Sequence, residues 1–451
     1  ISRKVKEWFY ACVLDCCFSK DDILEAYLNI IYTGPNIYGV KEAALYYFNR
    51  DIKDLSLAEC AFLAGINNSP NSYNPFSDTD KSEKISKRTK TVLSKMKELG
   101  YISENEYNEA VSQVDNGLKF SKGNLQNNSS VYSYHTDGLI NEIISDFSNQ
   151  KHISQDFATN YFYLSGSYIY STQNSDIQKV VENECKNKKY VLKSSKNDDY
   201  AQAAVVIMDQ SNGYVIACSG GLGEKTKSRG FNRATQMKRQ TGSSMKPVAV
   251  LAPAIEKKLV TNVTVFADEP TTFTDYNGEA YSPIDYDNYK GSITLRQAVE
   301  SSQNIPFVKL MEQLTPQVSI RYLKKMGITT LNDKDVNLAL ALGGLDQGIS
   351  PLEFAGAYSS IANDGVYIEP TFYTEITRKN GKRLVKNKQE KRRVFSEEVA
   401  YVLKELLTQP VLGSKGTATY CKINGVDVAA KTGTTDENYD RWLCGFTPYY
   451  T

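Results

Sequence analysis

Three short motifs in the second half of the chain combine the residue types of a serine nucleophile and its proton carriers. They are Ser243-Ser244-Met245-Lys246, Ser302-Gln303-Asn304 and Lys431-Thr432-Gly433. Residues three apart on a helix share a face, so the Lys246 amine can reach the Ser243 hydroxyl. A desolvated lysine near other cations can be neutral enough to take the serine proton. The first motif therefore indicates nucleophilic catalysis by Ser243 with Lys246 as the base, which is typically worth about 10²–10⁴ in rate.

The second motif supplies a second hydroxyl and an amide. Ser302 can relay a proton to a leaving amine. The Asn304 amide can orient both Lys246 and the backbone of a substrate. We therefore place both residues in the catalytic set with the first motif.

The third motif is predicted to lie on a strand beside the nucleophile. Lys431 would keep the site positive and recognise a substrate carboxylate. We assign Thr432, Gly433 and Thr434 to substrate binding and oxyanion stabilisation. The N–H groups of Ser243 and Thr434 are the candidate oxyanion hole, in which losing one donor typically costs about 10²–10³ in rate.

Each motif is weak on its own. Ser-x-x-Lys also occurs at Ser94–Lys97 and Ser148–Lys151, and we interpret both as solvated surface. The order and setting of the three motifs distinguish the copy at Ser243, which opens an apolar helical pattern predicted over 243–258. The next motif ends a predicted helix, and the last lies on a predicted strand that follows an Asn-Gly turn.

Composition limits what else the chain can be. Its 451 residues, with 41% hydrophobic and 23% charged residues, suit two or three globular domains. A net charge of +1 gives no general attraction to nucleic acid, and the basic run over 378–393 is predicted to be a solvated hairpin tip. No apolar run is long enough for a transmembrane helix. With only His135 and His152, a zinc site or a histidine base is disfavoured.

A change in hydrophobic period divides the chain into three regions. Residues 1–115 are predicted to be helical, and residues 116–200 form a linker region with a short strand over 161–170. From 201 to 451 strand and helix patterns mix, beginning with a hairpin around Asn212-Gly213. The fold class is therefore an all-α piece followed by an α+β domain. The eight cysteines are predicted to be buried free thiols.

With these motifs in order, the sequence resembles the class A penicillin-binding proteins, which are bifunctional peptidoglycan synthases. Residues 231–242, 289–306 and 342–365 resemble the family's segments around the three motifs. The resemblance implies a serine β-lactamase-like transpeptidase domain with a central antiparallel sheet, C-terminally truncated at 451. By that resemblance Ser243 attacks the D-Ala-D-Ala carbonyl of a stem peptide, releases D-Ala, and passes the acyl group to an amine. β-Lactams would acylate the same serine.

The first region resembles the C-terminal part of the family's lysozyme-like peptidoglycan glycosyltransferase. Residues 3–7 match its R-K-x-x-E motif, and residues 20–29 match K-x-x-I-L-E-x-Y-L-N. The resemblance implies a donor and acceptor site for lipid II that includes Arg3, Lys4, Glu7, Lys20, Glu25, Asn29 and Arg88. A divalent metal is a candidate cofactor of this reaction, whereas the transpeptidase is expected to need no cofactor.

The family's principal catalytic glutamate lies upstream of the R-K-x-x-E motif, so the glycosyltransferase is expected to be incomplete in this chain. The resemblance also implies a single-pass membrane anchor ahead of Ile1 and catalytic domains outside the cytoplasm. Expected partners are lipid II, nascent peptidoglycan, β-lactam antibiotics, the cell membrane, and divisome or elongation proteins, with no nucleic acid.

Other functions share the three motifs. A serine D,D-carboxypeptidase or β-lactamase uses the same residues, but neither needs the glycosyltransferase-like region. A noncatalytic penicillin-sensing or scaffold protein is the third reading. An acyl adduct that survives for many minutes and is absent in Ser243→Ala would favour the synthase, and rapid drug turnover would favour a β-lactamase.

Overall fold

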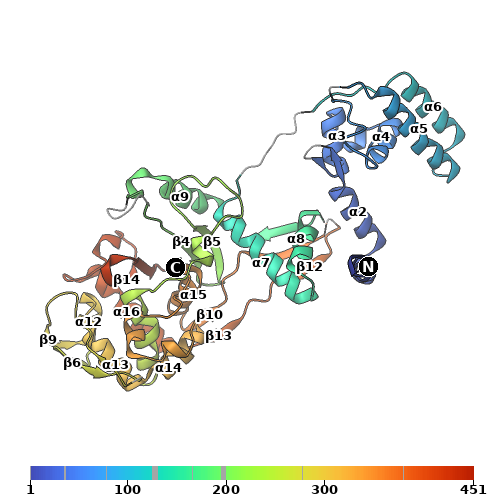
Figure 1. Ribbon diagram of the computed structural model, residues 1–451. Coiled ribbons are helices and arrows are strands. Elements are labelled where there is room, and N and C mark those ends of the chain that lie inside the picture. Colours follow the sequence, from blue (N-terminus) through green and yellow to red (C-terminus); the bar gives the residue numbers. More distant parts are fainter. Residues whose placement is uncertain are drawn as a thin grey trace. The chain divides into compact units, whose positions relative to one another are not determined.

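The computed structural model describes residues 2–34, 37–77, 79–123, 131–164, 166–193, 200–276, 278–378 and 380–451. They form two compact units. Unit 1 contains residues 1–130, 147–168 and 377–382, and unit 2 contains residues 131–146, 169–376 and 383–451. Helix α7 (Tyr134–Lys151) contributes residues to both (Figure 1).

Unit 1 is mainly helical. Its elements are α1 (Ser2–Cys17), α2 (Lys20–Ile30), β1 (Tyr32–Gly34), β2 (Ile37–Tyr38), α3 (Val40–Phe48), η1 (Ile52–Asp54), α4 (Leu57–Ile66), α5 (Ser82–Glu98), α6 (Glu104–Asp115) and α8 (Gln155–Leu164). Ser19, Ser56 and Ser103 begin α2, α4 and α6 with capping boxes, which satisfy N–H groups that have no partner inside the helix. An aromatic cluster that includes Phe62 and Phe120 packs with residues of α3, α4 and α5.

Unit 2 is an α+β domain. Its strands are β3 (Tyr168–Ser171), β4 (Val205–Asp209), β5 (Tyr214–Ser219), β6 (Val265–Asp268), β7 (Phe273–Thr274), β8 (Ala280–Tyr281), β9 (Gly291–Thr294), β10 (Val366–Ile368), β11 (Tyr373–Thr377), β12 (Arg383–Lys386), β13 (Lys391–Arg393), β14 (Ala429–Thr434) and β15 (Arg441–Phe446). Its longer helices are α9 (Ser175–Lys186), α12 (Leu295–Ser301), α13 (Ile305–Leu314), α14 (Pro316–Lys325), α15 (Pro351–Ala362) and α16 (Glu397–Leu412). The predicted fold class is confirmed.

Antiparallel strand pairs hold the centre of unit 2. β4 pairs with β5 around the Asn212-Gly213 turn, as predicted, and β14 pairs with β15 so that Lys431 lies opposite Cys444. The main chain of Thr451 exchanges two hydrogen bonds with Met208 on β4. The strand that carries the third motif therefore has a fixed register.

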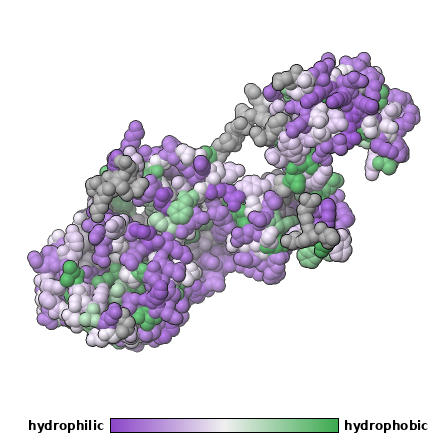
Figure 2. All heavy atoms as spheres, in the orientation of Figure 1, coloured by the Kyte–Doolittle hydropathy of each residue, from purple (hydrophilic) through white to green (hydrophobic). Residues whose placement is uncertain are grey.

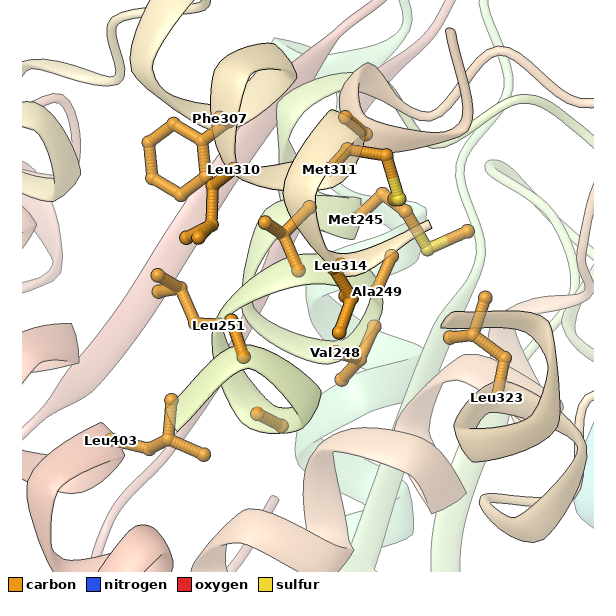
Figure 3. Packing of buried hydrophobic residues seen from close by; sticks show 14 of the residues in the cluster. Met245, Val248, Ala249, Leu251, Phe307, Leu310, Met311, Leu314, Leu323 and Leu403 are labelled. Atoms are coloured by element: carbon orange, nitrogen blue, oxygen red, sulfur yellow. The ribbon is translucent and has the colours of Figure 1, made fainter. Parts of the chain in front are cut away.

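A large apolar core lies under the first motif (Figure 3). Met245, Val248 and Leu251 pack in one buried cluster with residues of α13, α14 and α16. Fully burying a side chain of this size contributes about 1.5–3 kcal/mol. The core therefore anchors the segment that directly follows Ser243.

The segment predicted as one helix over 243–258 has three different helical geometries, so that prediction is wrong in this respect. A 3₁₀ turn η3 (Gly242–Met245) is followed by a π-helix η4 (Pro247–Leu251) and a short α-helix α11 (Ala252–Glu256). Pro247 and Pro253 both lie within this segment. Proline lacks the backbone N–H that the regular hydrogen-bond pattern of an α-helix needs. Residues 243–245 of the first motif lie in the 3₁₀ turn, and Lys246 directly follows it.

Two predictions outside the site need correction. The strand predicted over 161–170 is restricted to β3, because residues 161–164 belong to α8. Phe157 and Tyr161 lie one helical turn apart on α8, and both pack against Phe18. The basic run is not only a solvated tip, since Arg378 forms a half-buried ion pair with Asp22 at 2.7 Å.

The cysteine prediction is partly confirmed. The seven cysteines whose side chains are described are all free, but only two of them are buried, Cys185 and Cys218. Cys12, Cys16 and Cys60 are exposed, because α1 and α4 present these positions to solvent.

Hydrophilic residues cover most of the visible face of the molecule (Figure 2). Over the described residues, none of the helices combines the length and the apolar character that crossing a bilayer requires.

Candidate active site

Ser243 lies half-buried in the 3₁₀ turn η3. The backbone N–H of Lys246 donates to the Ser243 carbonyl, which closes an i to i+3 turn. Residues three apart in a 3₁₀ turn lie on the same side of it, so Ser243 and Lys246 share one side of this turn. The pairing of Ser243 with Lys246 as nucleophile and base stays a prediction.

Lys246 is fully buried and its ammonium faces the second motif. Nζ lies 2.8 Å from the carbonyl oxygens of Ser302 and Gln303, 2.7 Å from Asn304 Oδ1 and 3.5 Å from Ser302 Oγ. Burial, and then the charge of Lys431, lower the pKa of Lys246 well below its usual value.

Lys431 is the second fully buried lysine. From β14 its Nζ donates to Ser302 Oγ at 2.7 Å and to the Thr432 carbonyl at 3.0 Å. Burial lowers the pKa of Lys431 to about 7. Ser302 Oγ therefore accepts from one lysine and lies within reach of the other, which is the geometry of a proton relay.

Ser302 has φ 62° and ψ 33°, in the left-handed region, directly after α12. A residue with a Cβ pays about 1–2 kcal/mol for this conformation. The bonds from Lys246 to its carbonyl and from Lys431 to its hydroxyl hold it there. Strain of this kind is characteristic of functional sites.

The Asn304 amide is oriented from both ends. Its Nδ2 donates to the Ile284 carbonyl at 2.6 Å, so Oδ1 is left to accept from Lys246. Its backbone N–H donates to Asp285 Oδ1. The amide oxygen is thus aimed at Lys246, whereas the predicted role toward the substrate backbone stays a prediction.

Two glycines allow the third motif to reach the nucleophile turn. A Cβ on Gly242 would lie 2.5 Å from the Thr434 carbonyl oxygen, and a Cβ on Gly433 would collide with the Thr241 carbonyl oxygen. Gly242 also has φ 56°, which favours glycine. Ser243 and Thr434 are thereby neighbours, as an oxyanion hole made of their N–H groups requires.

The other residues of the third motif have structural partners. Thr432 Oγ1 donates to Thr417 Oγ1 at 2.8 Å, and Gly433 is buried against the nucleophile turn, whereas Thr434 is exposed. The five catalytic candidates and the three substrate-binding candidates of the sequence therefore lie in one place.

The sequence missed several residues that support this site. Gln303 is buried and donates to Asp268, and Asp285 holds the Asn304 backbone. Tyr358 Oη donates to the Ser244 carbonyl at 2.6 Å. These contacts join residues 19 to 114 positions apart in the sequence, so no local spacing could have revealed them.

The glycosyltransferase candidates in unit 1 lie on helix surfaces. Lys4 pairs with Glu7 at 2.5 Å on α1, with side chains 76% and 48% exposed, and Lys20 pairs with Asp15. Glu25 and Asn29 lie half-buried on α2. Arg88 on α5 donates to the Gly65 carbonyl at 3.1 Å. The side chain of Arg3 lies outside the described residues.

Within the described residues, no three His, Cys, Asp or Glu side chains are grouped so that they could hold a metal ion. We assign no step to a metal.

The two regions match two known domain families. Residues 203–450 match the penicillin-binding protein transpeptidase domain, and residues 1–97 match the transglycosylase family. Because the first match spans more than half of the chain, the protein belongs to the penicillin-binding protein transpeptidase family. It carries this domain after a transglycosylase region, the arrangement of bifunctional penicillin-binding proteins.

Similar curated proteins include penicillin-binding protein 1A of Clostridium botulinum strain Langeland, 37% identical over 464 residues, covering 100% of this chain and 56% of that protein. Penicillin-binding protein 1F of Bacillus subtilis is 35% identical over 457 residues, covering 100% of this chain and 59% of that protein. The chain therefore spans somewhat more than half the length of these relatives.

Solved structures share the fold. Penicillin-binding protein 1A of Haemophilus influenzae aligns with a TM-score of 0.63 at 24% identity, over 95% of this chain and 79% of that one. PonA1 of Mycobacterium tuberculosis in complex with penicillin V aligns with a TM-score of 0.56 at 22% identity, over 70% and 82%.

Proposed function

We propose that the protein is a bifunctional peptidoglycan synthase whose unit 2 is a serine D,D-transpeptidase and whose unit 1 belongs to the glycosyltransferase. One observation carries the transpeptidase assignment. Two fully buried lysines, Lys246 and Lys431, converge on Ser302 Oγ beside the Ser243 turn. A surface use of these motifs would leave the amines in water.

In the proposed acylation step, Ser243 Oγ attacks the carbonyl of the penultimate D-Ala, and Lys246 takes the hydroxyl proton. The C–N bond to the terminal D-Ala breaks, Ser302 passes its proton to the leaving nitrogen, and the proton held by Lys246 replaces it on Ser302. An acyl ester on Ser243 remains. An amine from a second stem peptide then attacks this ester, loses a proton to the same relay and restores the serine hydroxyl.

The charge state of Lys246 decides whether it can act as this base. Its three acceptors at 2.7–2.8 Å match the three donors of an ammonium. Burial and the charge of Lys431 favour the neutral amine. The lysine is completely removed from water, and this burial is the largest cause that lowers its pKa, which suits a base.

Lys431 and the strand edge account for substrate orientation. The Lys431 charge beside the exposed Thr434 suits the terminal carboxylate of a stem peptide or a β-lactam. The N–H groups of Ser243 and Thr434 would stabilise the oxyanion. A β-lactam that enters in the same pose would open its ring on Ser243 and form an acyl ester. The nitrogen that leaves the carbonyl would stay attached to this acyl group, because it is part of the opened ring.

The proposal extends to the cell envelope. Lys4 and Arg3 suit the pyrophosphate of lipid II, and Glu7, Lys20, Glu25, Asn29 and Arg88 complete the proposed glycosyltransferase site. Nascent peptidoglycan is the shared substrate, the cell membrane is the proposed location, and divisome or elongation proteins are the proposed partners. The domain limits 1–115, 116–200 and 201–451 remain part of this proposal.

A fluorescent penicillin tests the transpeptidase assignment. The chain should form an adduct that survives denaturing gel electrophoresis and persists for many minutes, and Ser243→Ala should form none. Rapid release of hydrolysed drug would instead indicate a β-lactamase, and a wild-type chain without any adduct would overturn the enzyme assignment.

A further inference from the structure

Two buried carboxyl groups lie against the Ser302–Asn304 segment and have no role in the steps above. Asp268 ends β6 and is fully buried, and Asp285 lies in the loop before β9 and is 8% exposed. The two carboxyl groups interact with each other, and this interaction raises the pKa of Asp285. Two ionised carboxylates in such a pair repel each other.

Each carboxyl group holds one part of that segment. Asp268 Oδ2 accepts from Gln303 Nε2 at 2.8 Å and from the Lys290 N–H at 2.8 Å. Asp285 Oδ1 accepts from the Asn304 N–H. Asn304 in turn presents Oδ1 to Lys246, so the pair determines where an acceptor of the catalytic lysine lies.

The remaining two oxygens reveal the protonation state. Asp268 Oδ1 and Asp285 Oδ2 are buried, and neither has a donor within the described part of the chain. Leaving a buried acceptor unsatisfied costs about 1–3 kcal/mol, and more for a charged group. A single proton shared between these two oxygens would satisfy both.

We propose that Asp285 is a positioning residue that carries a proton and donates it from Oδ2 to Asp268 Oδ1, which fixes Asn304 against Lys246. This inference rests on the proposed transpeptidase function. Asp268 is the anion of the pair because its Oδ2 already accepts two hydrogen bonds, whereas Asp285 accepts one.

The surroundings agree with this assignment. Burial raises the pKa of Asp285 to about 6, and the neighbouring Asp268 also raises it. The other charged groups in this region are Lys246, with Lys431 beside it, and two further lysines. The Lys290 ammonium pairs with Asp287. The Lys309 ammonium donates to the Ala267 carbonyl and lies near Glu269. Of these, Lys246 favours the ionised form of Asp285.

A functional consequence follows from the sign of this shift. Below the pKa of Asp285 the pair carries one negative charge and keeps its internal hydrogen bond. Above that pKa the pair carries two negative charges, and the two carboxylates repel each other. The added negative charge also favours the ammonium form of Lys246, which is not a base. Acylation should therefore lose part of its rate as pH rises through this ionisation.

Asp285→Asn tests the inference in the 451-residue chain. The amide keeps an acceptor for the Asn304 N–H and a donor for Asp268 but cannot ionise. The ratio of its acylation rate by fluorescent penicillin to that of the wild type should be near one at about pH 5 and rise at least about threefold by about pH 8. Taking the ratio cancels ionisations that both proteins share.

Three further variants complete the experiment. Asp287→Asn, an exposed change on the same loop, should give a ratio of one at each pH. Asp285→Ala, which loses the acceptor for Asn304, should lower the rate by at least about tenfold throughout. Asp268→Asn also removes the need for a shared proton and should reproduce the rising ratio if Asp285→Asn does not fold.

A flat ratio for the asparagine variants, or an equal loss in Asp285→Asn and Asp285→Ala, would overturn the shared proton. In that case the wild-type chain would still be acylated at Ser243, so the proposed function would stand. If the wild-type chain is not acylated at all, the proposed function fails first.

Discussion

The molecule contains the same four-residue pattern in both units with opposite settings. Ser243–Lys246 lies in unit 2, where Lys246 is fully buried and bonded to the 302–304 segment. Ser94–Lys97 lies on α5 of unit 1, where Ser94 is exposed and Lys97 is 37% exposed and paired with Glu104 at 2.6 Å. Spacing alone therefore does not make a site.

The difference teaches that burial gives a lysine its chemistry. An ammonium in water keeps its proton, whereas removal from water next to a second cation favours the neutral amine. Unit 2 supplies both conditions, because core residues surround the Ser243 turn and β14 brings Lys431. Lys97 is held by an anion and faces solvent.

The largest effect is expected from removing the buried lysine. Lys246→Ala should lower the rate of penicillin acylation by at least about 10³, because the base and the link to Asn304 are both lost. Lys97→Ala is the matched control and should leave the rate unchanged. Stopped-flow acylation measures both, and comparable losses in the two variants would break the contrast between the units.

The second-largest effect on the acylation rate is expected from removing the Ser302 hydroxyl. Ser302→Ala removes the group that accepts from Lys431 and lies 3.5 Å from Lys246 Nζ. We expect about 10²-fold slower acylation. Ser301→Ala, one residue earlier with its hydroxyl on the Gln297 carbonyl, should change the rate little. Equal rates for Ser302→Ala and wild type would remove Ser302 from the mechanism.

The free energy of unfolding should also differ between a buried residue of unit 2 and an exposed residue of unit 1. Phe307→Ala, in the fully buried core of Figure 3, should lower the free energy of unfolding of unit 2 by about 3–5 kcal/mol. Trp8→Ala, at a side chain that is 71% exposed on α1, should change the stability by less than about 0.5 kcal/mol. Denaturant unfolding measures both, and similar losses would mean that the core assignment is wrong.

The smallest effect concerns a carboxyl group at α7. Burial raises the pKa of Glu142 to about 7, although Thr371 Oγ1 and the Phe372 N–H donate to it. Since the folded-state pKa lies above the unfolded one, this stabilisation is complete at low pH and is lost as pH rises from about 4.5 through 7. Glu142→Gln should therefore flatten the fall in Tm over that range.

Glu398→Gln, at an exposed position of α16, is the control and should keep the wild-type slope. An unchanged slope in Glu142→Gln would show that Glu142 does not titrate there.

Local sequence predicted the parts of the site that local structure builds. One turn places Ser243 and Lys246, and one strand, whose register β15 fixes, places Lys431. The left-handed Ser302 had no sequence signal, because strain is imposed by contacts with Lys246 and Lys431. These contacts depend on tertiary structure.

The residues behind the second motif illustrate the same limit. Asp268 and Asp285 look like ordinary loop acids in the sequence, and only folding brings their carboxyl groups together. The one-helix prediction for 243–258 failed because apolar periodicity does not distinguish α-, 3₁₀- and π-turns when prolines interrupt the ladder.

The central claim is that burial makes Lys246 a base, and its pKa is the most direct measurement. Lysines labelled at ¹³Cε can be titrated by NMR in the 451-residue chain, with the Lys246 signal assigned through its loss in Lys246→Arg. We predict that this signal titrates well below the usual value of 10.5. A Lys246 signal that stays in the ammonium form up to that pH would contradict the account.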